Sequence, residues 1–264
     1  MRTAGLDIGS RSMELAVVDA SKGEILFSRE AETTPEIASV CRKMLEETMF
    51  DRLIVTGYGR ALAEVSFGFP SVTEIKAYAR GAHAIFPGCR TVLDIGGQDT
   101  KAIALDGSGR AINFEMNDRC AAGTGRFLEM IAAALGYELS ELGPGALSGK
   151  NSIQISSMCA VFAESEVVGL LSRGVRREDI ALAVHHTIAA RTGTMLARVG
   201  AKFPIVFAGG GARNQSLVRL IGDVLKCDLL VPPQPQMLGA LGAALLAMDD
   251  YRLTIETQAF NRQS

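Results

Sequence analysis

Residues 5–10 read Gly-Leu-Asp-Ile-Gly-Ser, and residues 92–97 read Val-Leu-Asp-Ile-Gly-Gly. Both stretches have the same organisation: an apolar strand that ends in Asp-Ile-Gly, a polar turn and a second apolar strand. Self-similarity within a chain is typical of a repeated structural unit. The pair therefore predicts two similar lobes that face each other, each built on a β-hairpin.

The segments around these two stretches predict an α/β fold. Apolar runs of strand length alternate with segments whose apolar residues recur at helical spacing. No low-complexity linker separates the two halves. We expect strands at residues 3–7, 13–19, 24–28, 53–56, 91–97, 101–105, 110–115 and 205–208. We expect helices at residues 36–47, 126–135, 163–172, 180–199 and 216–225, and a small-residue helix around 238–244 that lets another element approach closely.

Composition excludes several classes of protein. The 264 residues are 48% hydrophobic, which is enough for a packed core, and the net charge is −2 with both signs scattered along the chain. A nucleic-acid partner is not expected, because no basic stripe could neutralise its phosphates. An acidic residue, Asp7, comes too early for a secretory signal, and no apolar run approaches the ~20 residues that span a bilayer. We expect a cytoplasmic protein with no membrane partner.

Each Asp-Ile-Gly predicts a phosphate-binding turn. Glycines let backbone N–H groups approach a phosphate closely, so Gly9 with Ser10 and Gly96 with Gly97 are candidates for these contacts. The preceding Asp7 and Asp94 could hold Mg²⁺ through water molecules. One such turn alone would more often simply close a hairpin. Two in matching contexts, with a third glycine run at 209–211 after another strand, favour a nucleotide site.

Two of the five cysteines precede predicted helices. We expect Cys120 and Cys159 to lie at helix N-termini, where the positive end of the helix dipole stabilises a thiolate or an anionic cluster. A 4Fe-4S cluster takes four thiolates, so a two-fold axis would supply the second pair. A cysteine taken alone is more often a small buried apolar residue. That interpretation applies to Cys41, Cys89 and Cys227.

Together, the two aspartate turns and the run Gly209-Gly210-Gly211 resemble the phosphate and adenosine motifs of the actin/Hsp70/hexokinase (ribonuclease H-like) superfamily. The resemblance implies two lobes around a nucleotide cleft, with the glycine run under the adenosine. It also implies that Gln98 and Asp99 lie near the γ-phosphate, where Gln98 could orient the attacking water. Alternatively, Gln98 is a solvated turn residue with no role in hydrolysis. Lys101 could contact the nucleotide, although we expect a solvated surface charge.

Longer motifs resemble the activators of 2-hydroxyacyl-CoA dehydratases, members of the BadF/BadG/BcrA/BcrD-type ATPases. The matching stretches are residues 57–60 (GYGR), 94–101 (DIGGQDTK), 116–128 (MNDRCAAGTGRFL) and 159–167 (CAVFAESEV). The resemblance implies a homodimer with one 4Fe-4S cluster held by Cys120 and Cys159 of both subunits. It implies lobe I at residues 1–90, with a helix at about 236–264 packing back on it, and lobe II at 91–235.

The same resemblance implies a redox activity. A reduced flavodoxin or ferredoxin would supply an electron, and ATP hydrolysis would drive it into a 2-hydroxyacyl-CoA dehydratase. ATPase subunits of benzoyl-CoA reductase share these motifs, so a related CoA-thioester reductase is an alternative acceptor. The third glycine and Arg213 of the adenosine run depart from the usual pattern, which leaves the adenine contacts least defined.

Two other classes of function fit the same fold. A small-molecule kinase, such as a sugar kinase, would need a carboxylate base beside an acceptor pocket, but it would not need the two cysteines. A nucleotide-dependent switch without catalysis, like a chaperone ATPase lobe or a filament subunit, is the third possibility.

Overall fold

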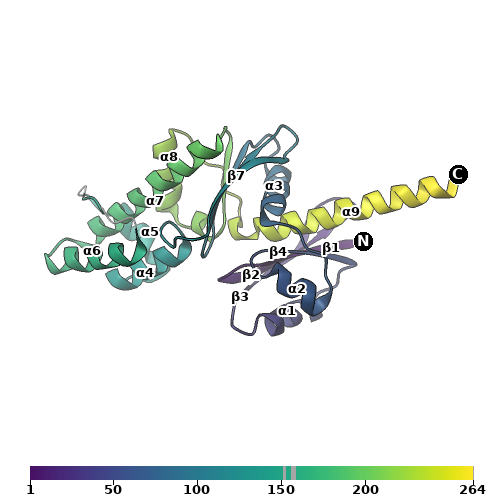
Figure 1. The fold of residues 1–264 in the computed structure, drawn as a ribbon, viewed down its shortest axis with the longest axis horizontal. Coiled ribbons are helices and arrows are strands. Elements are labelled where there is room, and N and C mark those ends of the chain that lie inside the picture. Colours follow the sequence, from purple (N-terminus) through teal and green to yellow (C-terminus); the bar gives the residue numbers. More distant parts are fainter. Residues whose placement is uncertain (151–152, 156–158, 264) are drawn as a thin grey trace. The chain divides into compact units, whose positions relative to one another are not determined.

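The computed structural model describes residues 1–150, 153–155 and 159–263, with side chains described through Leu253. The chain forms two compact units (Figure 1). Unit 1 comprises Met1–Gly88, Asp106–Ala111 and Gln236–Ser264. Unit 2 comprises Cys89–Leu105 and Ile112–Pro235.

Unit 1 contains a four-stranded sheet in the order β3-β2-β1-β4. The central strand β1 pairs antiparallel with β2 and parallel with β4. Six of its seven residues are buried, as a strand with two covered faces requires. The strands are β1 (Arg2–Ile8), β2 (Ser12–Asp19), β3 (Ile25–Glu32) and β4 (Arg52–Thr56).

Two pairs of helices cover this sheet. Leu6 and Leu15 pack in one core cluster with Cys41 and Met44 of α1 (Ile37–Glu46) and with Ala63 of α2 (Arg60–Phe67). The other face carries α9 (Leu238–Gln263), which packs on β1 and on α3 (Glu74–Ile85).

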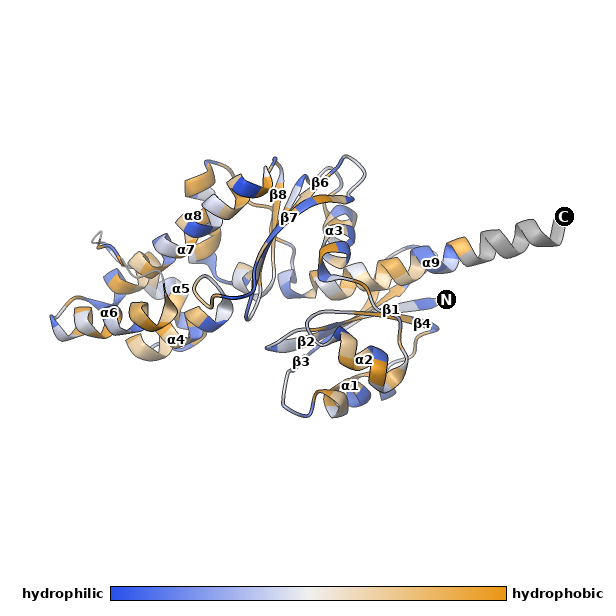
Figure 2. Ribbon diagram, in the orientation of Figure 1, coloured by the Kyte–Doolittle hydropathy of each residue, from blue (hydrophilic) through white to orange (hydrophobic). Residues whose placement is uncertain are grey.

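Glycines allow α9 to approach its neighbours closely. A Cβ added at Gly242 would lie 1.8 Å from the carbonyl oxygen of Ala77 in α3, and one at Gly5 would lie 2.1 Å from the carbonyl oxygen of Ala240. Both distances are below any real carbon–oxygen contact, so backbone packs directly on backbone. The first turns of α9 are mostly apolar (Figure 2), as the expected small-residue helix requires.

Unit 2 repeats the sheet of unit 1. Its strand order is β7-β6-β5-β8, and β5 pairs antiparallel with β6 and parallel with β8. The two stretches with Asp-Ile-Gly therefore occupy the same place in two sheets of the same topology, as the internal repeat predicts. The strands are β5 (Thr91–Ile95), β6 (Thr100–Leu105), β7 (Ala111–Asn117) and β8 (Ile205–Ala208).

Helices of unit 2 share one large core with its sheet. Leu93 and Phe207 from the strands pack in the same cluster as Phe127, Val167 and Leu217 from the helices. Helix α4 also packs against α6, and α7 packs against α8. The helices are α4 (Gly125–Leu135), α5 (Leu139–Leu147), α6 (Ala160–Ser172), α7 (Arg177–Val199) and α8 (Gln215–Leu225).

All the expected strands and helices are confirmed, with shifts of a few residues at their ends. Three helices were not predicted: α2, α3 and α5. The sequence of α5 contains Gly143-Pro144-Gly145, which normally breaks a helix. It nevertheless forms because Glu138 and Glu141 make a capping box at its start and Leu142 is fully buried.

The close packing of α9 makes a stability prediction. We expect Gly242→Ala to lower the free energy of unfolding by about 2–3 kcal/mol, because the new methyl group must displace the α3 backbone. Gly169→Ala in α6 is the matched control, since a Cβ there meets no atom within 4 Å. It should be neutral or stabilising by up to about 1 kcal/mol. Urea unfolding of both variants checks this, and a Gly242→Ala midpoint equal to wild type would contradict it.

Candidate functional site

Asp7 lies at the end of β1 with its carboxylate between two glycines. The side chain is 3% exposed. A Cβ at Gly57, just after β4, would lie 2.4 Å from Asp7 Oδ1, and a Cβ at Gly239, in the first turn of α9, would lie 2.0 Å from Oδ2. Only glycine at these two positions leaves room for the carboxylate, so the turn after β4 and the start of α9 are both shaped around Asp7.

Unit 2 builds the same arrangement around Asp94. Asp94 is fully buried, and a Cβ at Gly209, just after β8, would lie 2.1 Å from its Oδ1. Gly57 and Gly209 both have a positive φ, 93° and 79°, which glycine adopts without strain. The motif Gly57-Tyr58-Gly59 is thus the structural counterpart of Gly209-Gly210-Gly211, a relation that the repeat in the sequence did not reveal.

The two sites differ in the residue across from the aspartate. Asp7 is paired in register with Glu14 on β2, whereas Asp94 is paired with Lys101 on β6. Lys101 Nζ lies 3.0 Å from Asp94 Oδ2 and 2.8 Å from Asp99 Oδ2. The expected solvated surface charge is wrong, since Lys101 is 1% exposed. A buried ammonium needs such carboxylate partners to offset its desolvation.

Hairpin turns follow both aspartates. In unit 2, the amide of Gly96 donates to the carbonyl of Asp99 at 2.9 Å, which places Gly97 and the exposed Gln98 at the tip of the turn. In unit 1, Gly9 and Ser10 form the corresponding turn, and Thr33 Oγ1 donates to the Gly9 carbonyl at 2.8 Å. Each turn therefore holds its glycines beside a strand-end aspartate, as the sequence predicts.

The glycine run 209–211 leads into a tightly held loop. Gly209 and Gly211 pack on Asp94 and Ile95, whereas a Cβ at Gly210 would meet no atom within 4 Å. Asn214 ends the loop and caps α8, its Oδ1 accepting from the amides of Ser216 and Leu217 at 3.0 and 3.2 Å. Gly210 is thus the open position of the run.

His185 supports this loop from α7, a role that the sequence alone did not suggest. Its Nε2 accepts from Asn214 Nδ2 at 2.9 Å, and its Nδ1 donates to the Ala181 carbonyl at 2.7 Å. Burial lowers the pKa of His185 below its ordinary value of 6.5, so the ring is neutral at pH 7. The buried His185 thus holds the side chain of the Asn214 cap.

Cys120 and Cys159 have different settings. Cys159 is the N-cap residue of α6, as predicted, and it is exposed. The expected helix N-terminus at Cys120 is wrong, because Thr124 is the N-cap of α4 and Cys120 lies in the preceding loop. Asn117 holds that loop, its Nδ2 donating to the Cys120 carbonyl at 2.9 Å and its Oδ1 accepting from the Cys120 amide at 3.3 Å.

The thiols of Cys41, Cys89 and Cys227 have raised pKa values. Cys41 and Cys89 are buried, and burial raises the pKa of both thiols above the ordinary 9.0. Burial and then the nearby Asp228 carboxylate raise the pKa of Cys227. A thiol with a raised pKa is a poor source of thiolate at neutral pH. The accessible pair, Cys120 and Cys159, is the better candidate for metal ligation.

Apolar side chains are exposed beside Cys159 and on the strand that precedes the Cys120 loop. Val161 and Phe162 on the first turn of α6 are 65% and 67% exposed, and Val168 further along is 51% exposed. Ile112 and Phe114 are also exposed, and both lie on β7, the strand before the Cys120 loop. Asn113 lies between them, and its Nδ2 donates a hydrogen bond to the Val199 carbonyl. Apolar groups on solvent-facing positions are typical of interaction surfaces.

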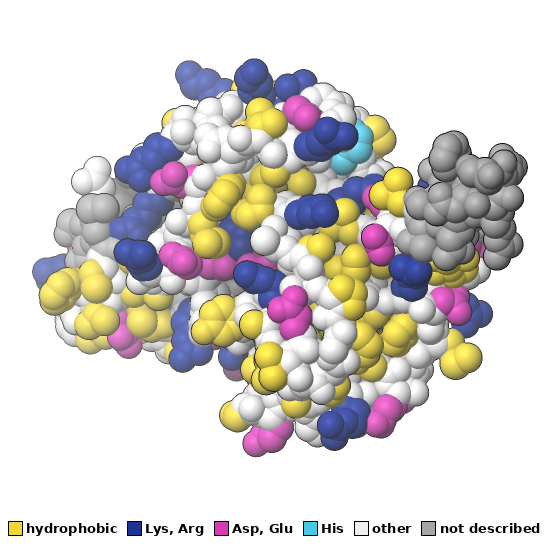
Figure 3. Space-filling model, turned by 45° about the vertical axis from the view of Figure 1, so that its right-hand side comes forward, with side chains coloured by type: hydrophobic (Ala, Val, Ile, Leu, Met, Phe, Trp, Pro, Cys, Tyr) yellow, Lys and Arg dark blue, Asp and Glu magenta, His cyan; other side chains and the backbone are white. Residues whose placement is uncertain are grey.

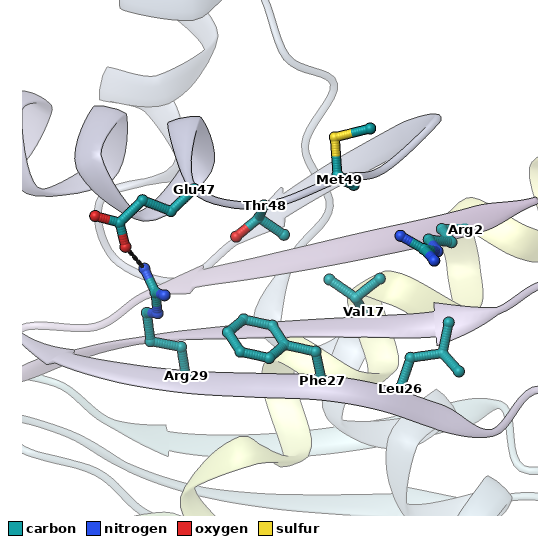
Figure 4. Close-up of a pocket in the computed structure, with 8 residues that line it drawn as sticks. All are labelled: Arg2, Val17, Leu26, Phe27, Arg29, Glu47, Thr48 and Met49. Atoms are coloured by element: carbon teal, nitrogen blue, oxygen red, sulfur yellow. Dashed lines mark hydrogen bonds and ion pairs between the residues drawn. The ribbon is translucent and has the colours of Figure 1, made fainter.

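A separate recess lies on unit 1 at the start of β1 (Figure 4). Its floor is apolar, and Arg29 forms an ion pair with Glu47 at one side. Arg2 is at the opposite end of β1 from Asp7, so this recess is distinct from the Asp7 site. The residues that line it are Arg2, Val17, Leu26, Phe27, Arg29, Glu47, Thr48 and Met49.

The molecular surface has mixed charge. Lys and Arg side chains are interspersed with Asp and Glu over the face shown in Figure 3. Among the described residues, no helix combines the length and apolar character needed to cross a bilayer. In the same part of the chain, no group of three or more His, Cys, Asp or Glu side chains is arranged to hold a metal ion.

The model of the BadF/BadG/BcrA/BcrD ATPase family matches residues 4–247, nearly the whole chain. The chain belongs to this ATPase family. Among its relatives, the 2-hydroxyisocaproyl-CoA dehydratase activator of Clostridioides difficile is 40% identical over 95% of this chain and 96% of its own. One of the subunits of benzoyl-CoA reductase from Thauera aromatica is 32% identical, and the match covers 92% of each chain.

Solved structures confirm the predicted fold class of this family member. The activator of the 2-hydroxyisocaproyl-CoA dehydratase from Clostridium difficile, with bound ADPNP, superposes with a TM-score of 0.89 at 38% identity, over 97% of this chain and 98% of that one. A glucokinase from Streptomyces griseus has a TM-score of 0.59 at 16% identity, over 94% and 100% of the two chains, and shares the fold alone. The expected ATPase and its actin/hexokinase-like fold are therefore both confirmed.

The neutral His185 predicts a pH dependence of stability. Below its ordinary pKa of 6.5 the unfolded chain takes up a proton at this residue, whereas the folded chain, whose His185 pKa is lowered, does not. Stability should therefore fall as the pH drops below 6.5, by at most about 1.4 kcal/mol per pH unit, and His185 should contribute no pH dependence above that range.

Urea unfolding at about pH 7.5 and about pH 5.5 measures this contribution. His185→Gln should lose less stability than wild type on acidification, because the titrating group is gone. His186→Gln is the matched control, since His186 is the exposed neighbour and should behave like wild type. An equal pH response in all three proteins would show that His185 titrates normally when folded.

Proposed function

We propose that this ATPase is the activator of a 2-hydroxyacyl-CoA dehydratase and delivers low-potential electrons to it at the expense of ATP. Two copies of the chain share one 4Fe-4S cluster, to which each contributes Cys120 and Cys159. The activator role is supported by relatives with that name that match nearly the whole chain. The ATPase activity follows from the family.

The observation that carries the proposal is the contrast among the five thiols. Cys120 is partly exposed and Cys159 is exposed, whereas Cys41 and Cys89 are buried with raised pKa values. Cys227 is also partly exposed, but burial and the Asp228 carboxylate raise its pKa. A cubane cluster takes four thiolates. Cys120 and Cys159 of each chain meet that number when a two-fold axis relates two chains. When bound, such a cluster supplies one-electron chemistry at a protein surface.

The apolar start of α6 supports a second copy at this place. Val161 and Phe162 directly follow Cys159 and are exposed. In an isologous contact the same patch of both subunits is buried, so these side chains would pack around the axis on which the four thiols meet. Their burial would also exclude water from the thiolates, which influences the potential of an iron–sulfur centre.

Nucleotide binding rests on the two aspartate turns. Asp7, a hard oxygen donor beside Gly9 and Ser10, suits a Mg²⁺ ion held through water. Asp94 would act through water as well, with Lys101 balancing its charge and that of Asp99. The turn that contains Gly96 and Gly97 would receive a phosphate, and the exposed Gln98 would orient the attacking water. The run 209–211 would pass under the adenosine.

Redox partners follow from the same proposal. A reduced flavodoxin or ferredoxin would load the electron, and the dehydratase would accept it. A benzoyl-CoA reductase system is the second candidate, favoured by the likeness over the whole chain to one subunit of that enzyme. A sugar kinase is the less favoured alternative, because the likeness to glucokinase is one of fold.

A substitution at Gly210, the open position of the glycine run, tests the adenosine site. Gly210→Val should leave the fold intact, because no protein atom lies within 4 Å of a Cβ at this position. Its side chain would occupy space that the nucleotide needs, so we expect the affinity for ADPNP to fall at least about tenfold. Calorimetric titration measures the affinity, and thermal unfolding checks the fold. Gly169→Ala is the control, and wild-type affinity in Gly210→Val would exclude nucleotide from this loop.

Removal of single thiols tests the shared cluster. Anaerobically reconstituted Cys120→Ala and Cys159→Ala should each lose the bound iron and the paramagnetic signal of the dithionite-reduced protein, since two of the four ligands disappear from each dimer. Cys227→Ala is the matched control and should retain both. Iron analysis and electron paramagnetic resonance provide the readout. A full iron content in Cys120→Ala would overturn the ligand assignment.

A further inference from the structure

The loop that carries Cys120 is hydrogen-bonded to the phosphate turn of the same unit. The amide of Gly125 donates to the Gly96 carbonyl at 2.8 Å, and the amide of Arg126 donates to the Gly97 carbonyl at 2.8 Å. Thr100 Oγ1, at the end of the turn, donates to the Gly123 carbonyl at 3.0 Å. Three bonds therefore join two segments that have separate roles in the proposed function.

Two of these bonds use the start of α4. The first amides of a helix have no partner within the helix and normally bond to a cap or to water. In α4 they bond to the turn itself, and the contact is close, because a Cβ at Gly125 would lie 3.1 Å from the Gly96 oxygen. The turn and the start of α4 are therefore joined directly by backbone hydrogen bonds.

Thr100 extends this connection toward the cysteine. Its side chain is 4% exposed, so its hydroxyl makes this bond away from solvent. The neighbouring carbonyls in the loop accept hydrogen bonds from other side chains. Arg191 Nη1 donates to the Ala122 carbonyl at 3.2 Å, and Thr124 Oγ1 donates to the Ala121 carbonyl at 2.6 Å. Of these three side-chain bonds, the one from Thr100 reaches the loop from the phosphate turn.

We propose that Thr100 is a positioning residue that transmits the state of the phosphate turn to the Cys120 thiol through the Gly123 carbonyl. The inference rests on the proposed roles of the turn and of Cys120. A phosphate bound at the turn that contains Gly96 and Gly97 shifts the turn, and the Thr100 hydroxyl transfers the shift to the loop. Cys120 then changes its position when nucleotide binds or leaves.

Cys159 provides an internal reference. It is the N-cap of α6, and its carbonyl accepts from the Ala163 amide at 2.9 Å, so its backbone belongs to that helix. Nucleotide should therefore alter the environment of Cys120 more than that of Cys159. Both thiols can be followed in one sample.

The test uses the full-length, cluster-free, reduced protein. Iodoacetamide alkylation of Cys120 and Cys159 is timed by mass spectrometry with and without Mg-ADPNP. In wild type we expect the Cys120 rate to change at least about fivefold, the lower end of typical coupling between sites, and the Cys159 rate to change less. Thr100→Val should abolish the change at Cys120 while leaving the ADPNP affinity within about twofold. Thr100→Ser, which keeps the hydroxyl, should restore it.

Each outcome bears on a defined claim. If ADPNP binds wild type without altering the Cys120 rate, or if Thr100→Val responds like wild type, the coupling through Thr100 is wrong and the proposed function stands. If ADPNP does not bind wild type at all, the proposed function fails and the coupling fails with it. Circular dichroism of Thr100→Val confirms that the variant is folded, and the Thr100→Ser result separates loss of the hydroxyl from altered packing.

Discussion

A buried carboxylate at the end of a central strand, packed against a glycine that follows the adjacent parallel strand, is the constraint on which both units depend. Asp7 meets Gly57 in this way, and Asp94 meets Gly209. A buried carboxylate is costly unless donors or cations surround it, so the local backbone must remain open around each aspartate. This requirement accounts for the glycines beside each carboxylate, and the strand order common to both sheets places the two aspartates at equivalent strand ends.

The two units share one sheet topology but carry different side chains across from their aspartates. Unit 2 carries Lys101 where unit 1 carries Glu14, and the buried lysine forms ion pairs with the buried Asp94 and the partly exposed Asp99. In unit 2 the turn after Asp94 is also hydrogen-bonded to the start of α4 and to the loop that carries Cys120. Under the proposed function, this arrangement would connect nucleotide hydrolysis to electron transfer.

The sequence predicted well those features that depend on local pattern. Strands were found because apolar runs end at Asp-Ile-Gly, and the aspartates and glycines of the turns lie where the repeat places them. Features that depend on tertiary contacts were missed. Lys101 looked like a surface charge because its partner Asp94 is a cross-strand neighbour, and α5 was missed because burial of Leu142 outweighs its glycines and proline. Cys120 was placed at a helix start because loop length is not visible in periodicity.

The backbone contacts around α9 limit how this protein can evolve. Gly5 and Gly242 leave no room for a Cβ, and every other amino acid carries one. No conservative replacement therefore exists at these positions, and any single-codon change there must be rescued by movement of a whole helix. Sequence drift in the family should concentrate on exposed faces, while this contact between α3, α9 and β1 remains unchanged over long divergence.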